Sequence, residues 1–240
     1  MTHLYEKNKL TFALVCIVAY VVLMSLADGL SQQLGVEKLV TAPVGAALAA
    51  LLMLWIMRRR LGEELGLCRF KGDARRYLCF LPLAVLASCN LWNGVHMNFT
   101  AGETALYVIS MLSVGVIEEL VFRGFLFTAL LRDGVRRAVI ISSLTFGLGH
   151  IVNLLNGAAL LPTLLQLVYA CAVGFMFTVL FYKGGSLWPC MITHGILNAL
   201  SAFAVDGTDA VDMLIAAALT VISVLYALWI LKRGAADKTE

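Results

Sequence analysis

Hydrophobic residues follow one another along this chain in eight long stretches, which short polar or charged breaks separate. The stretches cover approximately residues 10–30, 39–57, 77–95, 106–131, 138–155, 160–182, 186–204 and 211–231. A helix that crosses the hydrocarbon core of a bilayer needs about 20 predominantly apolar residues. The pattern therefore predicts an all-α fold, a polytopic membrane helical bundle of about eight transmembrane helices.

The composition narrows the class of protein further. Of the 240 residues, 61% are hydrophobic and 14% are charged, and the net charge is +3. Soluble domains are about 45–50% apolar and about 25% charged, so the composition excludes a soluble, disordered or nucleic-acid-binding protein. Because the longest break, about 58–76, is too short for a soluble domain, we expect residues 1–240 to form a single integral membrane domain in the lipid bilayer.

The positions of lysine and arginine predict the orientation, since cytoplasmic loops carry an excess of them. If the N-terminus is cytoplasmic, only Lys38 of the 18 Lys and Arg residues falls in an outer loop and only Arg123 falls inside a stretch. All the others fall in inner segments. The sequence therefore predicts that both termini are cytoplasmic.

A few ionisable residues lie deep inside the apolar stretches, where charge is costly and marks a functional site by default. They are Glu118, Glu119 and Arg123 in the fourth stretch, His150 in the fifth, and His194 in the seventh, where Asn198 follows. At a rise of 1.5 Å per residue, the first carboxylate and the two histidines lie about 21, 20 and 16 Å from the nearest inner cation. Three helices thus place these groups in one layer, which predicts a shared site. Glycines beside these residues should let the helices approach closely, as such a site requires; they are Gly115, Gly124, Gly147, Gly149 and Gly195.

Spacing within the helices predicts a different role for each of these residues. Glu119 and Arg123 stand at i and i+4 on one helix face, so the guanidinium can neutralise that carboxylate. Glu118 points about 100° away and is left as an unpaired carboxylate, which suits a general base. His194 and Asn198 are also at i and i+4, and two donors that face one point can hold an oxyanion.

Other interpretations of these residues stay open at this stage. Both carboxylates could simply bond neighbouring helices, and Cys190, four residues before His194, could act as a thiolate nucleophile. Chains of Glu and His also carry protons in transporters, so a proton-coupled transporter is one alternative. A non-catalytic bacteriocin immunity or scaffold protein is another.

Three motifs together resemble those of the CAAX protease and bacteriocin-processing family of intramembrane proteases, also called the Abi family. They are Glu118-Glu119-x-x-x-Arg123, Phe146-x-x-x-His150 and His194-x-x-x-Asn198, in the family's order on consecutive apolar stretches. The resemblance implies an intramembrane endopeptidase whose catalytic core covers about 106–204. It also implies that Glu118 activates the attacking water with the help of His150 and that His194 and Asn198 stabilise the oxyanion. Arg123, which fixes Glu119, and Phe146 are expected to give structural support.

The resemblance leaves the cofactor and the substrate less defined. We prefer a mechanism without a metal, because these residues already fill each catalytic role; if Zn²⁺ is bound, the expected ligands are Glu118, Glu119, His150 and His194. The short loops resemble bacterial members of the family. We therefore expect a bacterial cytoplasmic membrane protein that cleaves a hydrophobic or leader-bearing peptide or protein entering from the membrane.

Overall fold

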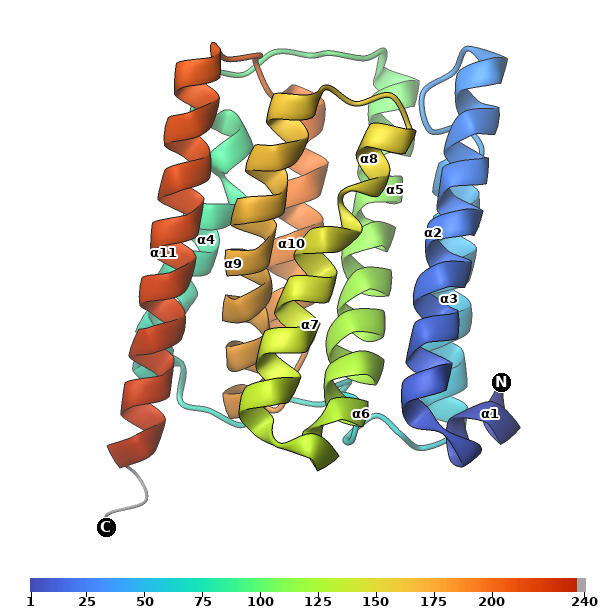
Figure 1. The fold of residues 1–240 in the computed structure, drawn as a ribbon. Helices are drawn as coiled ribbons and strands as arrows, with labels where there is room; N and C mark the ends of the chain where they lie inside the picture. The colour runs from blue at the N-terminus through green and yellow to red at the C-terminus, as the bar shows by residue number, and fades with distance from the viewer. Residues whose placement is uncertain (237–240) are drawn as a thin grey trace.

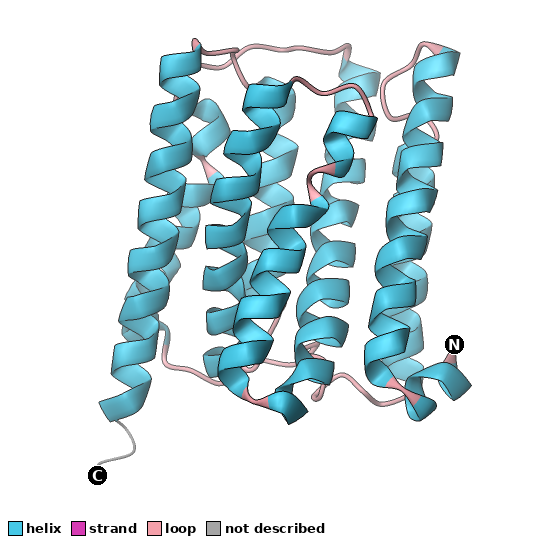
Figure 2. Ribbon diagram, in the orientation of Figure 1, coloured by secondary structure: helices cyan, strands magenta, loops and turns pink. Residues whose placement is uncertain are grey.

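The protein folds as a bundle of helices that run between two ends of the molecule (Figure 1). The computed structural model describes residues 1–236, apart from the side chains of residues 76, 79 and 234–236. Within residues 1–236 there is no strand, and a single antiparallel bridge pairs Val95 with Ala204 (Figure 2). The predicted all-α fold class is confirmed.

Six of the eight predicted stretches form helices that are long and apolar enough to cross a membrane. They are α2 (Lys9–Leu34), α3 (Thr41–Arg58), α5 (Ala101–Glu118) with its continuation to Asp133, α7 (Val135–Gly149) with α8 (Val152–Leu155), α9 (Leu160–Gly184) and α11 (Asp209–Ala236). The continuation of α5 consists of η3 (Glu119–Phe127), α6 (Thr128–Leu130) and η4 (Leu131–Asp133). The chain is thus an integral membrane protein.

The remaining two stretches form shorter helices. Residues 77–95 fall in η1 (Ala74–Phe80), α4 (Leu81–Ala87) and η2 (Cys89–Leu91), and residues 186–204 fall in α10 (Trp188–Leu200) and η5 (Ser201–Phe203). The 13 residues of α10 rise only about 20 Å, less than the bilayer core of about 30 Å. Both α4 and α10 run alongside the long helices (Figure 1), but a total of eight transmembrane helices stays a prediction.

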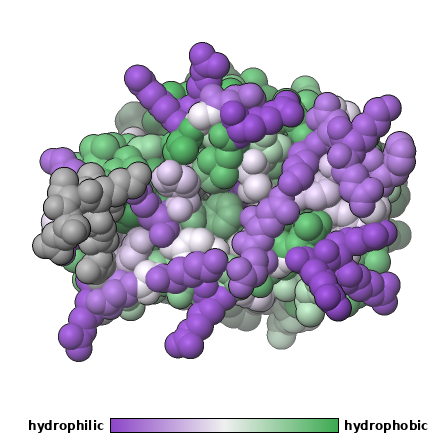
Figure 3. Space-filling view, turned by 90° about the horizontal axis from the view of Figure 1, so that it is seen from below, coloured by the Kyte–Doolittle hydropathy of each residue, from purple (hydrophilic) through white to green (hydrophobic). Residues whose placement is uncertain are grey.

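The cations predicted to face the cytoplasm gather at one end of the bundle, which we call the basic end. It holds α1 (Thr2–Lys7), the last turn of α11 and the turns between α3 and α4, between α6 and α7, and between α9 and α10 (Figure 1). Figure 3 looks onto this end and shows hydrophilic side chains projecting over it. Lys238 lies outside the described residues, as does the side chain of Arg76. That the basic end faces the cytoplasm stays a prediction.

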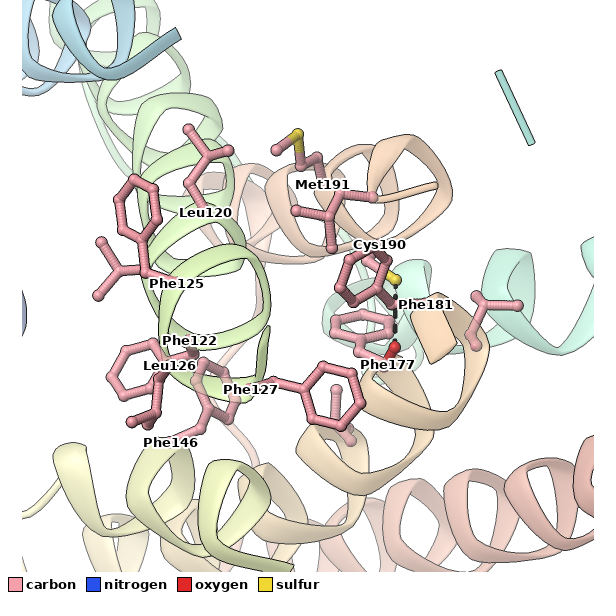
Figure 4. Close-up of a cluster of buried hydrophobic side chains, with 14 of the residues drawn as sticks. Leu120, Phe122, Phe125, Leu126, Phe127, Phe146, Phe177, Phe181, Cys190 and Met191 are labelled. Carbon is pink, nitrogen blue, oxygen red and sulfur yellow. Dashed lines mark hydrogen bonds between the residues drawn. The ribbon is translucent and has the colours of Figure 1, made fainter. Parts of the chain in front are cut away.

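The core of the bundle surrounds η3. Helix α5 packs against α3 and α10, α9 packs against α7 and α11, and α2 packs against η3. Figure 4 shows the aromatic side chains where these elements meet: Phe122, Phe125 and Phe127 of η3, Phe146 of α7, and Phe177 and Phe181 of α9. All nine residues of η3 are buried, so this segment is held from several sides.

Candidate active site

The pair of glutamates lies where the chain changes from an α-helix to a π-helix. Glu118 is the last residue of α5, and Glu119 is the first residue of η3, a π-helix of nine residues. Such i→i+5 segments are rare in proteins and occur frequently at functional sites. The sequence did not predict this change, because the hydrophobic pattern of a buried segment does not distinguish the two hydrogen-bond registers.

Glu119 is the centre of a buried ion-pair network. Its Oε1 accepts a hydrogen bond from Arg123 Nη1 at 2.9 Å, as the i, i+4 spacing predicts, and lies 2.9 Å from Nδ1 of His194 on α10. The side chains of Glu119 and Arg123 are completely inaccessible to solvent. Because the carboxylate can only accept, Nδ1 of His194 carries the hydrogen in this contact. Glu119 therefore orients the imidazole as well as pairing with the guanidinium.

Aromatic rings complete the surroundings of the guanidinium. The Cζ atom of Arg123 lies 4.1 Å from the ring centre of Phe146 and 5.7 Å from that of Phe177. Its Nε and Nη2 have no hydrogen-bond partner among the described residues. Contact between a desolvated guanidinium and aromatic faces stabilises the charge. Phe146 also meets the rings of His150 and His194 edge-on, with centroids 5.4 and 5.6 Å apart, which is consistent with the supporting role predicted for it.

Glu118 has different partners from Glu119. Its Oε1 accepts a hydrogen bond from the hydroxyl of Tyr20 on α2 at 2.6 Å. Its Oε2 lies 3.5 Å from Nε2 of His194 and has no hydrogen-bond partner among the described residues. A buried polar atom without a partner is uncommon and is found at catalytic positions. The two neighbouring carboxylates thus face the same histidine from its two nitrogens.

His150 lies at a break in its helix. Helix α7 ends at Gly149, His150 is its C-cap residue, and α8 begins at Val152. The sequence pattern predicted one uninterrupted helix over 138–155. Non-helical backbone at membrane depth is tolerated where it is buried in protein or lines a cavity, and His150 does line a cavity. Its ring makes no hydrogen bond within residues 1–236 and is free to meet a ligand.

A cavity of about 860 Å³ lies beside these residues. Tyr20, Glu118, Phe146, His150 and Asn198 are on its wall, together with further residues from α2, α5, α9 and α11. The wall continues to the end opposite the basic end, where it includes Lys38, Asn93, Asp206 and Asp212. Glu119, Arg123 and His194 are behind the wall rather than on it.

Glycines bring the helices of the site close together, as the sequence predicted for three of five positions. A Cβ atom on Gly115 of α5 would lie 2.6 Å from the backbone nitrogen of Gly195 on α10, and one on Gly147 of α7 would lie 2.8 Å from the backbone nitrogen of Cys171 on α9. For Gly124 and Gly149 the expectation is wrong, because a Cβ atom there would make ordinary contacts of 3.6 Å and 3.9 Å.

The structure brings together several residues that the sequence singled out, but the sequence did not predict all of their contacts. Glu118, His150 and Asn198 share one cavity, and Glu119 pairs with Arg123. The roles predicted for these residues stay predictions. The contact of His194 with Glu119 and the contact of Tyr20 with Glu118 were missed, because the partners are 75 and 98 residues apart and no local spacing signals them.

The same contacts bear on whether the expected zinc ligands fit a metal ion. Glu118, Glu119, His150 and His194 are near one another, but Oε1 of Glu119 already bonds Arg123 and His194. Among the described residues, no group of three or more His, Cys, Asp or Glu side chains is arranged to hold a metal ion. The four residues thus do not fit a metal in this arrangement.

The chain also matches a known family over the segment that carries these residues. Residues 100–200 match the family model described as type II CAAX prenyl endopeptidase Rce1-like. This match confirms the resemblance to the CAAX protease family and implies a protease. The matched segment includes Glu118, His150, His194 and Asn198 but excludes Tyr20. No curated protein and no solved structure matches the chain.

Proposed function

We propose that this protein is an intramembrane endopeptidase in which Glu118 activates a water molecule for attack on a peptide bond. The observation that carries the proposal is the position of Glu118, a carboxylate on the wall of a cavity inside an apolar bundle, beside His150 and Asn198. An intramembrane carboxylate at such a place is costly and is kept for function. The family match over residues 100–200 supports the same class of reaction.

The charges of the cluster support a general base at this position. Glu118 and Glu119 carry two negative charges when both are ionised, and Arg123 balances one of them. Each ring nitrogen of His194 faces one of the two carboxylates, at 2.9 and 3.5 Å, so the imidazole is placed between them. Buried charges are stable only when they are paired. Because Arg123 pairs with Glu119 and not with Glu118, the carboxylate of Glu118 is the one left to accept a proton from water.

The chemical steps follow from these positions. Water between Glu118 and His150 gives a proton to Glu118 while its oxygen bonds to the scissile carbonyl carbon. The carbonyl oxygen becomes an oxyanion, for which the amide of Asn198 on the cavity wall supplies a hydrogen-bond donor. His194 faces the two carboxylates from behind this wall and keeps them in place. Glu118 then returns the proton to the amine nitrogen as the carbon–nitrogen bond breaks.

The shape of the cavity indicates the side from which substrate comes. The cavity reaches the end of the bundle opposite the basic end, which by the excess of inner cations is the non-cytoplasmic end. We propose that a hydrophobic peptide, or the membrane-associated end of a protein, enters from this side or from the membrane. In a bacterial cell this places the reaction at the outer half of the cytoplasmic membrane.

The test is cleavage of a quenched fluorogenic library of hydrophobic peptides by the purified protein in detergent. Glu118→Gln keeps the size of the side chain and removes the base, so we expect activity to fall by about 100-fold or more, in the range for loss of a general base. The control is Glu63→Gln, because Glu63 is an exposed glutamate in the loop after α3, and it should behave as wild type.

A chelator tests the metal question in the same assay. Activity that survives 1,10-phenanthroline in the wild type and disappears in Glu118→Gln supports the glutamate-activated water. Activity that is lost on chelation and returns with Zn²⁺ contradicts the proposed mechanism. Equal activity of Glu118→Gln and wild type contradicts the role of Glu118, and proton-coupled uptake by protein in sealed vesicles would then favour a transporter.

A further inference from the structure

One contact of the general base comes from a part of the chain that the family match does not cover. Tyr20 lies in the middle of α2, and its hydroxyl donates a hydrogen bond to Oε1 of Glu118 at 2.6 Å. The tyrosine is 8% exposed, and its ring is on the wall of the cavity. Residues 100–200 form the matched segment, so α2 adds a contact to the site from outside it.

The geometry of this contact is that of a strong hydrogen bond. A hydroxyl that donates to an ionised carboxylate forms bonds of about 2.5–2.7 Å, shorter and stronger than those between neutral groups. A buried tyrosine hydroxyl needs a partner, because leaving it without one costs free energy. Tyr20 has this single hydrogen bond within the described residues. Its hydroxyl is thus committed to Glu118.

We propose that Tyr20 is a positioning residue for catalysis, which holds Oε1 of Glu118 and orients the carboxylate toward the cavity. The inference rests on the proposed function of Glu118. With one oxygen fixed by the hydroxyl, the carboxylate cannot rotate about its terminal bond, and its other lone pairs stay available to a water molecule. Tyr20 itself transfers no proton and acts only through Glu118.

The other charged and titratable groups around Glu118 stay in place when the hydroxyl is removed. They are His194 of α10, His150 of α7, and Glu119 and Arg123 of η3. None of them makes a hydrogen bond with Tyr20 in the described structure. A change of Tyr20 to phenylalanine therefore removes one hydrogen bond, keeps the ring, and leaves the ion-pair network intact.

The experiment compares Tyr20→Phe with wild type under the peptide assay. Hydrogen bonds to charged groups contribute about 1.5–3 kcal/mol, which corresponds to a fall in kcat of about 10- to 150-fold, with KM unchanged within about twofold. The matched control is Tyr226→Phe, which removes a hydroxyl that donates to the carbonyl of Tyr77 at 2.8 Å and should change neither quantity.

A second readout does not depend on peptide cleavage or on large effects on folding. The carboxylate stretching band of Glu118, assigned by its disappearance in Glu118→Gln, should shift in the infrared difference spectrum of Tyr20→Phe and not in that of Tyr226→Phe. If Tyr20→Phe proves unstable, 3-fluorotyrosine at position 20 keeps the hydroxyl and should shift the same band. An unshifted band, or a wild-type kcat in a folded Tyr20→Phe, overturns the inference. If the band shifts in Tyr20→Phe but the wild-type protein cleaves no peptide, the proposed function is overturned instead.

Discussion

At the scale of single residues, one guanidinium holds the polar groups of the site in place. Arg123 bonds Glu119, Glu119 bonds His194, and His194 faces Glu118. Each member is buried, so each depends on the next to compensate its charge or polar atoms. The i, i+4 spacing of Glu119 and Arg123 was enough to predict the first bond. The rest of the network requires α10, whose place beside α5 no local pattern specifies.

Removal of this guanidinium should be costly. In Arg123→Ala the carboxylate of Glu119 is left buried without its cation, which destabilises proteins by about 3–5 kcal/mol. We therefore expect a clear fall in Tm, measured by thermal unfolding in detergent. Arg132→Ala is the control, since Arg132 is an exposed cation near the end of the same transmembrane segment, and its Tm should stay close to that of wild type. An unchanged Tm for Arg123→Ala would contradict the pairing.

At the scale of helices, the site depends on how closely α5 approaches α10. Gly115 and Gly195 allow the two backbones to touch, and small residues at helix interfaces permit this in membranes. The position of glycines next to the polar residues predicted such an approach. The π-helix η3 and the break at His150 were not predictable in the same way, because the side-chain pattern is compatible with an uninterrupted α-helix while the surrounding packing selects the irregular backbone.

Adding one methyl group at this contact tests how closely the two helices approach each other. In Gly115→Ala the added Cβ meets backbone atoms of Gly195, which cannot move as a flexible side chain would. Overpacking of this kind costs about 1–3 kcal/mol, so we expect a lower Tm and lower peptidase activity. Gly102→Ala, in the first turn of the same helix with nothing within 4 Å of the new atom, should leave both unchanged. Wild-type behaviour of Gly115→Ala would argue against this packing.

At the scale of the whole molecule, the cavity extends from the middle of the bundle to the end opposite the basic end. Six long apolar helices were predictable from hydropathy alone, as was the gathering of cations at one end. The cavity was not predictable, because its wall combines residues from the beginning, the middle and the end of the chain. The sequence indicated that the polar groups lie at a similar depth in the membrane. It did not indicate to which end of the bundle their cavity extends.

The side of access can be measured with single cysteines in a variant that lacks the six native ones. Asp206→Cys, at the exposed end of the cavity wall, should react with a membrane-impermeant maleimide in intact cells. Arg136→Cys, at the exposed start of α7 at the basic end, should react only after the membrane is opened. Block of peptidase activity by the maleimide at position 206 would also agree with substrate passing there. The reverse labelling pattern would contradict the orientation.

The contact between Tyr20 and Glu118 has a consequence for how such an enzyme can be divided or recombined. The segment 100–200 carries the recognisable motifs, yet the carboxylate of Glu118 accepts a hydrogen bond from a hydroxyl of α2. Consider a chimaera that joins residues 100–200 to the first helices of another protease. It would keep each motif, but it would lose this hydrogen bond unless those helices place a hydroxyl at the same depth. The first helices therefore contribute to the active site. An exchange between homologues should preserve activity only when these helices are exchanged together with residues 100–200.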